Sequence, residues 1–141
     1  MRRGFTLPEL LSAVSIAAIL VSIVTPPLVR LLDQAAVREG VDRFASLYAT
    51  TRELAMSRGA LARLELDRAQ RWGAVSVQRP DGAWDTVATG TLGSAGLSCS
   101  VCTLVFNPIG VGYGASNARL VFARGSAADT VTTSRTGRLK R

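Results

Sequence analysis

The sequence predicts an α+β protein in which one long N-terminal helix packs on an antiparallel β-sheet domain of about six strands. Apolar residues recur at helical spacing as far as residue 58. From residue 61 onward they alternate with polar residues in short runs, as is typical of strands. Turn signals such as PDG, GSAG and RGS separate those runs. The 141 residues are enough for one modest domain.

The first part of the helix is apolar and uncharged. Residues 10–29 form a run of 20 residues without a charge, which as a helix would rise about 30 Å and match one hydrocarbon core. Arg2 and Arg3 precede this run, as expected on the cytoplasmic side of a membrane helix. Glu9 lies at its edge, where a carboxylate normally has a partner or a function.

The second part of the helix is amphipathic. An apolar stripe at spacings near 3.6 residues predicts one face on a core, and Gly59 follows as a stop signal. Gly40 interrupts the pattern, and we expect it to soften the helix. The stripe comprises Val37, Val41, Phe44, Tyr48 and Ala55.

Six short runs with alternating polarity predict the strands of the sheet. They are residues 61–66, 74–79, 84–89, 102–106, 118–123 and 130–135.

Composition argues against several classes of activity. The chain has no histidine and two cysteines, whereas a zinc site needs four suitable ligands. Histidine is also the usual general base beside Ser or Cys nucleophiles, and the predicted strands carry no clustered carboxylates. We therefore expect no metal, no cofactor and no enzymatic activity.

Three general interpretations of the N-terminus leave part of it unexplained. A secretory signal peptide fits the basic start and apolar middle, but SIVTPPLVRLL offers no small-residue cleavage site. A twin-arginine export signal rests on the arginine pair alone in an arginine-rich chain. A plain transmembrane anchor explains the length but leaves Glu9 without a role.

The stretch GFTLPELL resembles the prepilin processing motif of type IV pilins and type II secretion pseudopilins. The resemblance implies that a prepilin peptidase removes leader residues 1–4, cutting between Gly4 and Phe5, and that the new N-terminal Phe5 is methylated. Residues 5–29 would then be the transmembrane helix and filament stem, and residues 30–141 a periplasmic pilin domain. Glu9 would pair with the new amine of a neighbouring subunit, because two charges that are costly alone in lipid become tolerable together.

The rest of the chain resembles the GspH/FimT group of minor pilins and pseudopilins. The resemblance rests on TTRELAMSRGALARLEL, FNPIGVGYGASNARLVFARG and the closing TTSRTGRLKR, whereas residues 73–100 contribute little. It implies a type IV pilin-like fold and a non-enzymatic subunit at the tip or initiation complex of a filament. That filament is either a type II secretion pseudopilus or a type IV pilus. The implied partners are other pilins, the prepilin peptidase, the assembly platform and the lipid of a bacterial inner membrane.

The basic C-terminus suggests an alternative function. The formal net charge is +7, and no acidic residue follows Asp129. In the FimT branch a Gly-Arg-x-Arg ending contributes to binding DNA for uptake. Here lysine stands where that motif has its second arginine, so a point charge replaces the bidentate fork. The candidate residues for binding double-stranded DNA are Arg135, Arg138, Lys140 and Arg141.

Cys99 and Cys102 form a C-x-x-C pair ahead of a predicted strand. A thioredoxin-like redox motif belongs in a βαβ context, which the predicted domain lacks. A small structural disulfide in an oxidising periplasm is the favoured interpretation, and redox activity is the alternative.

Overall fold

The computed structural model describes residues 6–114 and 116–141, with the backbone alone for residues 23–26. In these described residues, helix α1 (Leu7–Arg58) is followed by nine strands. The chain divides into two compact units, Met1–Leu32 and Asp33–Arg141. The first contains the N-terminal part of α1, and the second contains the rest of α1 with all the strands.

The N-terminal unit is an apolar helix whose described side chains are exposed. An 18-residue window of α1 has a mean hydropathy of 2.2, and none of that window is buried within the protein. By length and composition α1 can therefore cross a membrane.

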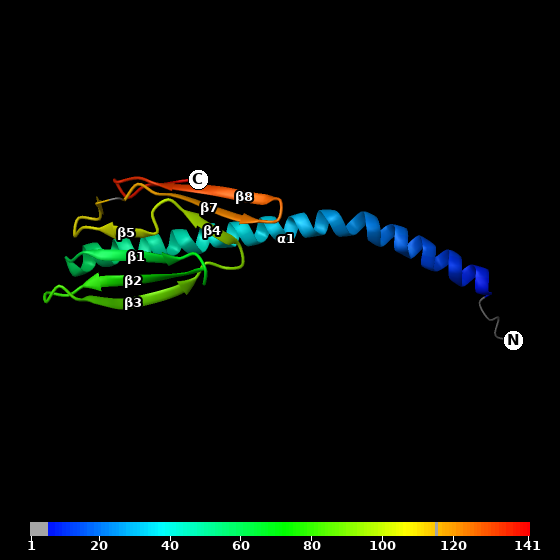
Figure 1. Cartoon of the computed structure of the whole chain (residues 1–141), viewed down its shortest axis with the longest axis horizontal. Helices are drawn as coiled ribbons and strands as arrows, with labels where there is room; N and C mark the ends of the chain where they lie inside the picture. The colour runs from blue at the N-terminus through cyan, green and yellow to red at the C-terminus, as the bar shows by residue number, and fades with distance from the viewer. Residues whose placement is uncertain (1–5, 115) are drawn as a thin grey trace. The chain divides into compact units, whose positions relative to one another are not determined.

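The nine strands form two antiparallel sheets (Figure 1). One sheet has the order β3-β2-β1-β5-β6 and the other β4-β7-β8-β9. The strands of the first are β1 (Ala62–Asp67), β2 (Trp72–Gln78), β3 (Trp84–Thr91), β5 (Thr103–Phe106) and β6 (Gly112–Tyr113). The strands of the second are β4 (Gly96–Cys99), β7 (Arg119–Arg124), β8 (Ala127–Thr133) and β9 (Leu139–Lys140).

All six predicted strands are present, as β1, β2, β3, β5, β7 and β8. The three additional strands are only four, two and two residues long. Segments this short contain too few residues to establish an alternating pattern. The division into two sheets was not predicted either, because alternation within a strand does not identify its neighbours.

The core joins the C-terminal part of α1 to both sheets. All five residues of the predicted apolar stripe are buried in one hydrophobic cluster. The Phe44 ring lies 6.2 Å from that of Phe122 in the four-stranded sheet. One turn later, the Tyr48 ring lies 4.9 Å from that of Phe106 in the five-stranded sheet. The helix ends at Arg58, and Gly59 adopts the left-handed conformation with φ of 59°.

Gly40 interrupts the apolar pattern but not the helix, because α1 is continuous through it. Gly40 lies where the helix packs closely against Phe122 of β7 and Leu92 after β3. A Cβ atom there would be 2.8 Å from Cδ1 of Phe122 and 3.1 Å from the carbonyl oxygen of Leu92. The missing side chain thus allows this close packing.

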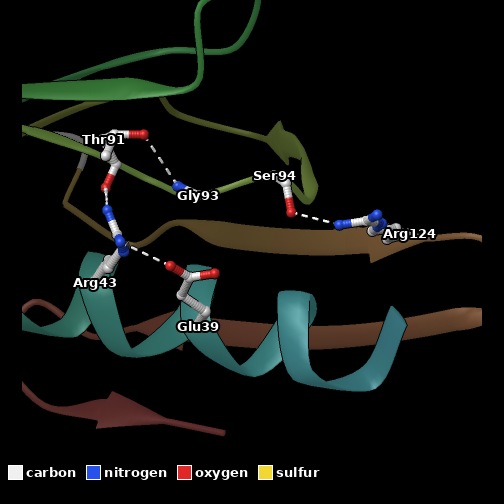
Figure 2. A network of polar contacts seen from close by, with 6 residues as sticks. All are labelled: Glu39, Arg43, Thr91, Gly93, Ser94 and Arg124. Atoms are coloured by element: carbon white, nitrogen blue, oxygen red, sulfur yellow. Dashed lines mark hydrogen bonds and ion pairs between the residues drawn. The ribbon is translucent and has the colours of Figure 1, made fainter. Parts of the chain in front are cut away.

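Polar contacts hold the loop between β3 and β4 against α1 and β7 (Figure 2). Arg43 pairs with Glu39 at 2.7 Å and donates a hydrogen bond of 3.3 Å to the carbonyl oxygen of Thr91. From β7, Arg124 donates to the hydroxyl of Ser94 and pairs with Asp33 of α1 at 3.3 Å. Within the second unit, these contacts tie residues 33–43 of α1 to the loop after β3 and to β7.

Candidate functional site

The residues at the predicted processing site are only partly described. Gly4 and Phe5 lie outside the described residues. The description begins at Thr6, which caps α1 together with Glu9. The backbone nitrogen and the hydroxyl of Thr6 donate hydrogen bonds of 2.9 and 2.7 Å to Oε2 of Glu9.

This arrangement contains one half of a capping box, the bond in which the third helical residue reaches back to the N–H of the capping residue. It satisfies a backbone donor that has no partner within the helix. The Glu9 carboxylate also lies in the first turn, where the helix dipole favours negative charge. Sequence reasoning missed this role of Glu9, although the T-x-x-E pattern of residues 6–9 is a recognised signal for it.

The two cysteines are joined at the crossing between the sheets. Cys99 ends β4 of the four-stranded sheet, and Cys102 directly precedes β5 of the five-stranded sheet. The structure has a disulfide between them, with their Cα atoms 5.5 Å apart. The carbonyl oxygen of Cys102 accepts a hydrogen bond of 2.8 Å from Leu66, which extends the pairing of β5 with β1. The disulfide thus closes the short connection that carries the chain from one sheet to the other.

The basic C-terminal residues lie in a hairpin. The N–H of Ser134 donates to the carbonyl oxygen of Arg138 at 2.9 Å, and Gly137 donates back to Ser134 at 2.9 Å. Gly137 has φ of 77°, as expected of the left-handed residue in a three-residue hairpin loop. After the turn, β9 pairs with β8, with Leu139 opposite Thr133 and Lys140 opposite Thr132.

The four candidate DNA-binding residues are not equivalent. Arg141 donates to the Asp129 carboxylate and forms an ion pair with it. Arg135, Arg138 and Lys140 are exposed, and within the described residues their side chains form no ion pair. The hairpin therefore keeps three of the four charges available.

A depression of about 540 Å³ lies along this hairpin. Its lining combines hydroxyl groups with two cations, a set that can donate hydrogen bonds to phosphate oxygens. The lining residues are Thr132, Thr133, Ser134, Thr136, Arg138, Leu139 and Lys140.

Comparison with known proteins agrees with the N-terminal motif. Residues 1–25 match the family described as the prokaryotic N-terminal methylation motif. No curated protein shows significant sequence similarity to the chain.

Solved structures share the fold at low sequence identity. The minor pseudopilin EpsH from the type 2 secretion system of Vibrio cholerae is 16% identical, with a TM-score of 0.61 over 74% of this chain and 94% of that chain. The type IV minor pilin FimU of Pseudomonas aeruginosa is 11% identical, with a TM-score of 0.60 over 73% of this chain and 90% of that chain. The chain therefore combines the prokaryotic N-terminal methylation motif with the fold of minor pseudopilins and minor pilins, as its resemblance to the GspH/FimT group predicted.

Proposed function

We propose that the chain is a minor pilin or pseudopilin that acts as a structural subunit, not as an enzyme. A prepilin peptidase cuts it between Gly4 and Phe5 and methylates Phe5. The mature chain waits in the bacterial inner membrane with its domain in the periplasm. The assembly platform then adds it to the tip or initiation complex of a type II secretion pseudopilus or a type IV pilus. The observation that carries the proposal is the methylation motif on a pilin-like fold with an exposed apolar stem.

In this proposal, Glu9 positions the subunit in the filament. Cleavage creates an amine on Phe5, and in lipid that cation needs an anionic partner. Both hydrogen bonds from Thr6 use Oε2 of Glu9, and among the described residues Oε1 accepts none. Glu9 can thus keep its capping bonds and still receive the amine of a neighbouring subunit. The pair sets the axial register between the two stems.

The test compares Glu9→Gln and Glu9→Leu in the full-length chain, expressed with its own filament machinery. Both variants should be cleaved, with methylated Phe5 detected by mass spectrometry, but both should be depleted from sheared filaments because the charge is missing. Asp81→Asn is the matched control, since it removes an exposed carboxylate from the turn between β2 and β3. Normal incorporation of Glu9→Leu would refute the proposed role.

Which filament the chain joins requires a separate experiment. A deletion strain is assayed both for release of exoproteins and for natural transformation. Loss of secretion alone assigns the chain to a pseudopilus, and loss of transformation alone assigns it to a type IV pilus.

A second candidate function is DNA binding by the C-terminal hairpin of a FimT-like minor pilin. The supporting observation is that Arg135, Arg138 and Lys140 are exposed and have no carboxylate partner among the described residues. Each cation that neutralises a phosphate contributes about 0.9 to the slope of log K against log salt. Replacing all three with Gln should therefore reduce that slope by nearly 3 for double-stranded DNA. An unchanged slope would refute this function.

A further inference from the structure

The register of the four-stranded sheet brings a distant arginine beside the C-terminal hairpin. Arg119 of β7 lies opposite Thr132 of β8, and Thr132 lies opposite Lys140 of β9. Residues directly opposite one another on antiparallel strands point to the same face. Leu120, which follows Arg119, is buried in the core, so Arg119 and Lys140 point away from it. Arg138 directly precedes β9, and its carbonyl oxygen accepts the N–H of Ser134 at the end of the hairpin. Extending the alternation of β9 back by one residue puts Arg138 on the same face as Lys140.

This outward face carries no acidic side chain. The single carboxylate in the four strands is Asp129, which lies opposite the buried Phe122 and therefore belongs to the inward face. The remaining outward positions are uncharged. They are Gly96, Ser98, Val121, Ala123, Ala128, Thr130 and Thr132.

The cations at inward positions of these strands are neutralised. Arg124 at the end of β7 pairs with Asp33, and Arg141 after β9 pairs with Asp129. By contrast, the side chains of Arg119, Arg138 and Lys140 are exposed and form no ion pair within residues 6–114 and 116–141. In the four-stranded sheet, the paired cations thus lie at inward positions, and Arg119, Arg138 and Lys140 lie on the outward side.

Hydrogen bonds hold the backbone that carries two of these cations. Both backbone polar groups of Arg119 bond to Ser100. The Arg119 N–H donates to the Ser100 hydroxyl at 2.9 Å, and the Ser100 N–H donates to the Arg119 carbonyl oxygen at 3.0 Å. The N–H of Arg138 donates to the hydroxyl of Ser134 at 3.2 Å. Cations on a fixed backbone lose less conformational entropy on binding than cations on a mobile tail do.

We propose that Arg119, Arg138 and Lys140 form one cationic face that binds the phosphodiester backbone of double-stranded DNA, and that Arg141 is not part of it. This inference rests on the second function proposed above. Strand geometry separates Arg138 from Lys140 by about 7 Å and Arg119 from Lys140 by about 10 Å at the backbone. Neither distance exceeds the Debye length of about 10 Å at 0.1 M salt, so the potential of Lys140 overlaps that of each arginine. Contacts of this kind bind DNA without reading its sequence.

The experiment measures the salt dependence of binding between 50 and about 200 mM salt, the range in which phosphate contacts weaken strongly. The full-length chain in non-ionic detergent is titrated with a short DNA duplex. Arg119→Gln should reduce the slope by about 0.9, and Arg119→Gln with Lys140→Gln by about 1.8. Arg119→Lys should retain the slope, because a point charge suffices. Arg79→Gln is the matched control, since Arg79 pairs with Asp81 in the turn of the other sheet.

The measurements distinguish failure of DNA binding by the hairpin from failure of the proposed cationic face. If Arg135, Arg138 and Lys140 can be replaced together without changing the slope, DNA binding by the hairpin is itself refuted. If that triple replacement lowers the slope but Arg119→Gln does not, the hairpin binds DNA alone and the proposed face is wrong. Arg119-dependent binding to micelles doped with phosphatidylglycerol, without Arg119-dependent binding to DNA, would assign the face to a lipid surface and overturn the proposal. A drop of about 0.9 for Arg141→Gln would also contradict it.

Discussion

Replacing Gly40 with alanine should destabilise the domain, although alanine is the better helix former. In an exposed helix this substitution would stabilise by about 1 kcal/mol. Here the new Cβ would lie 2.8 Å from Cδ1 of Phe122 and 3.1 Å from the carbonyl oxygen of Leu92. The Phe122 side chain has no exposed area and the other atom belongs to the backbone, so neither can move freely.

The expected loss of stability is the cost of overpacking minus the gain in helix propensity. Overpacking a core by a methyl group typically costs about 1–3 kcal/mol, and a rigid neighbour favours the upper part of that range. After the gain in helix propensity, the free energy of unfolding should fall by about 1–2 kcal/mol. For a domain of this size that lowers the melting temperature by roughly 5–10 °C.

The assay is urea unfolding of residues 33–141, followed by circular dichroism. Every residue of the hydrophobic core cluster lies within this segment. Ser46→Ala is the control, because Ser46 is exposed on the same helix and its replacement should be neutral or slightly stabilising. In a Phe122→Leu background, the cost of Gly40→Ala should shrink, since the ring that it meets is gone. A Gly40→Ala protein at least as stable as the parent would refute the packing argument.

Three other predictions concern local features. Replacing Cys99 and Cys102 with Ser opens a very short loop. The free energy of unfolding should fall by about 2 kcal/mol or less, which thermal unfolding would measure. An unchanged melting temperature would mean that the disulfide adds no stability. Burial raises the pKa of Tyr48 above its ordinary value of 10.0. The neutral phenol should therefore contribute its full stabilisation below pH 10, and this stabilisation should be lost as the pH rises through the folded-state pKa. Tyr48→Phe should flatten this alkaline loss of stability in urea titrations. Thr6→Ala removes the hydroxyl that donates to the Glu9 carboxylate but keeps the backbone N–H bond to it. Hydrogen exchange in micelles should then show faster exchange in the first turn, equivalent to about 1 kcal/mol for one hydrogen bond; unchanged exchange would mean that this hydroxyl does not stabilise the turn.

The apolar stem, the buried stripe of α1 and six strands could be predicted from the sequence because each depends on local periodicity. The stripe from Val37 to Ala55 repeats at helical spacing whatever it packs against, and all its members are buried. The short strands could not be found in this way, since two residues such as Gly112 and Tyr113 define no period. The packing role of Gly40 could not be predicted for a related reason, because helix propensity ignores a phenylalanine 82 positions further along the chain.

The same distinction applies to the candidate sites. The prepilin motif is a local pattern, and it was recognised in residues that the matching family also covers. The basic C-terminus was equally visible, but composition alone treats Arg141 and Arg138 as equal. Only the pairing of Arg141 with Asp129 separates them.

The sequence by itself determined that this protein has an apolar stem, a processing motif and an α+β domain, because hydropathy, spacing and charge are properties of neighbouring residues. The tertiary structure alone decided which charges remain unpaired and which face they share. Arg119 and Lys140 are 21 positions apart in the chain, yet strand register places them on one surface with only Thr132 between them. Register depends on which strands pair and on the turns that join them, and no local pattern around Arg119 contains that information.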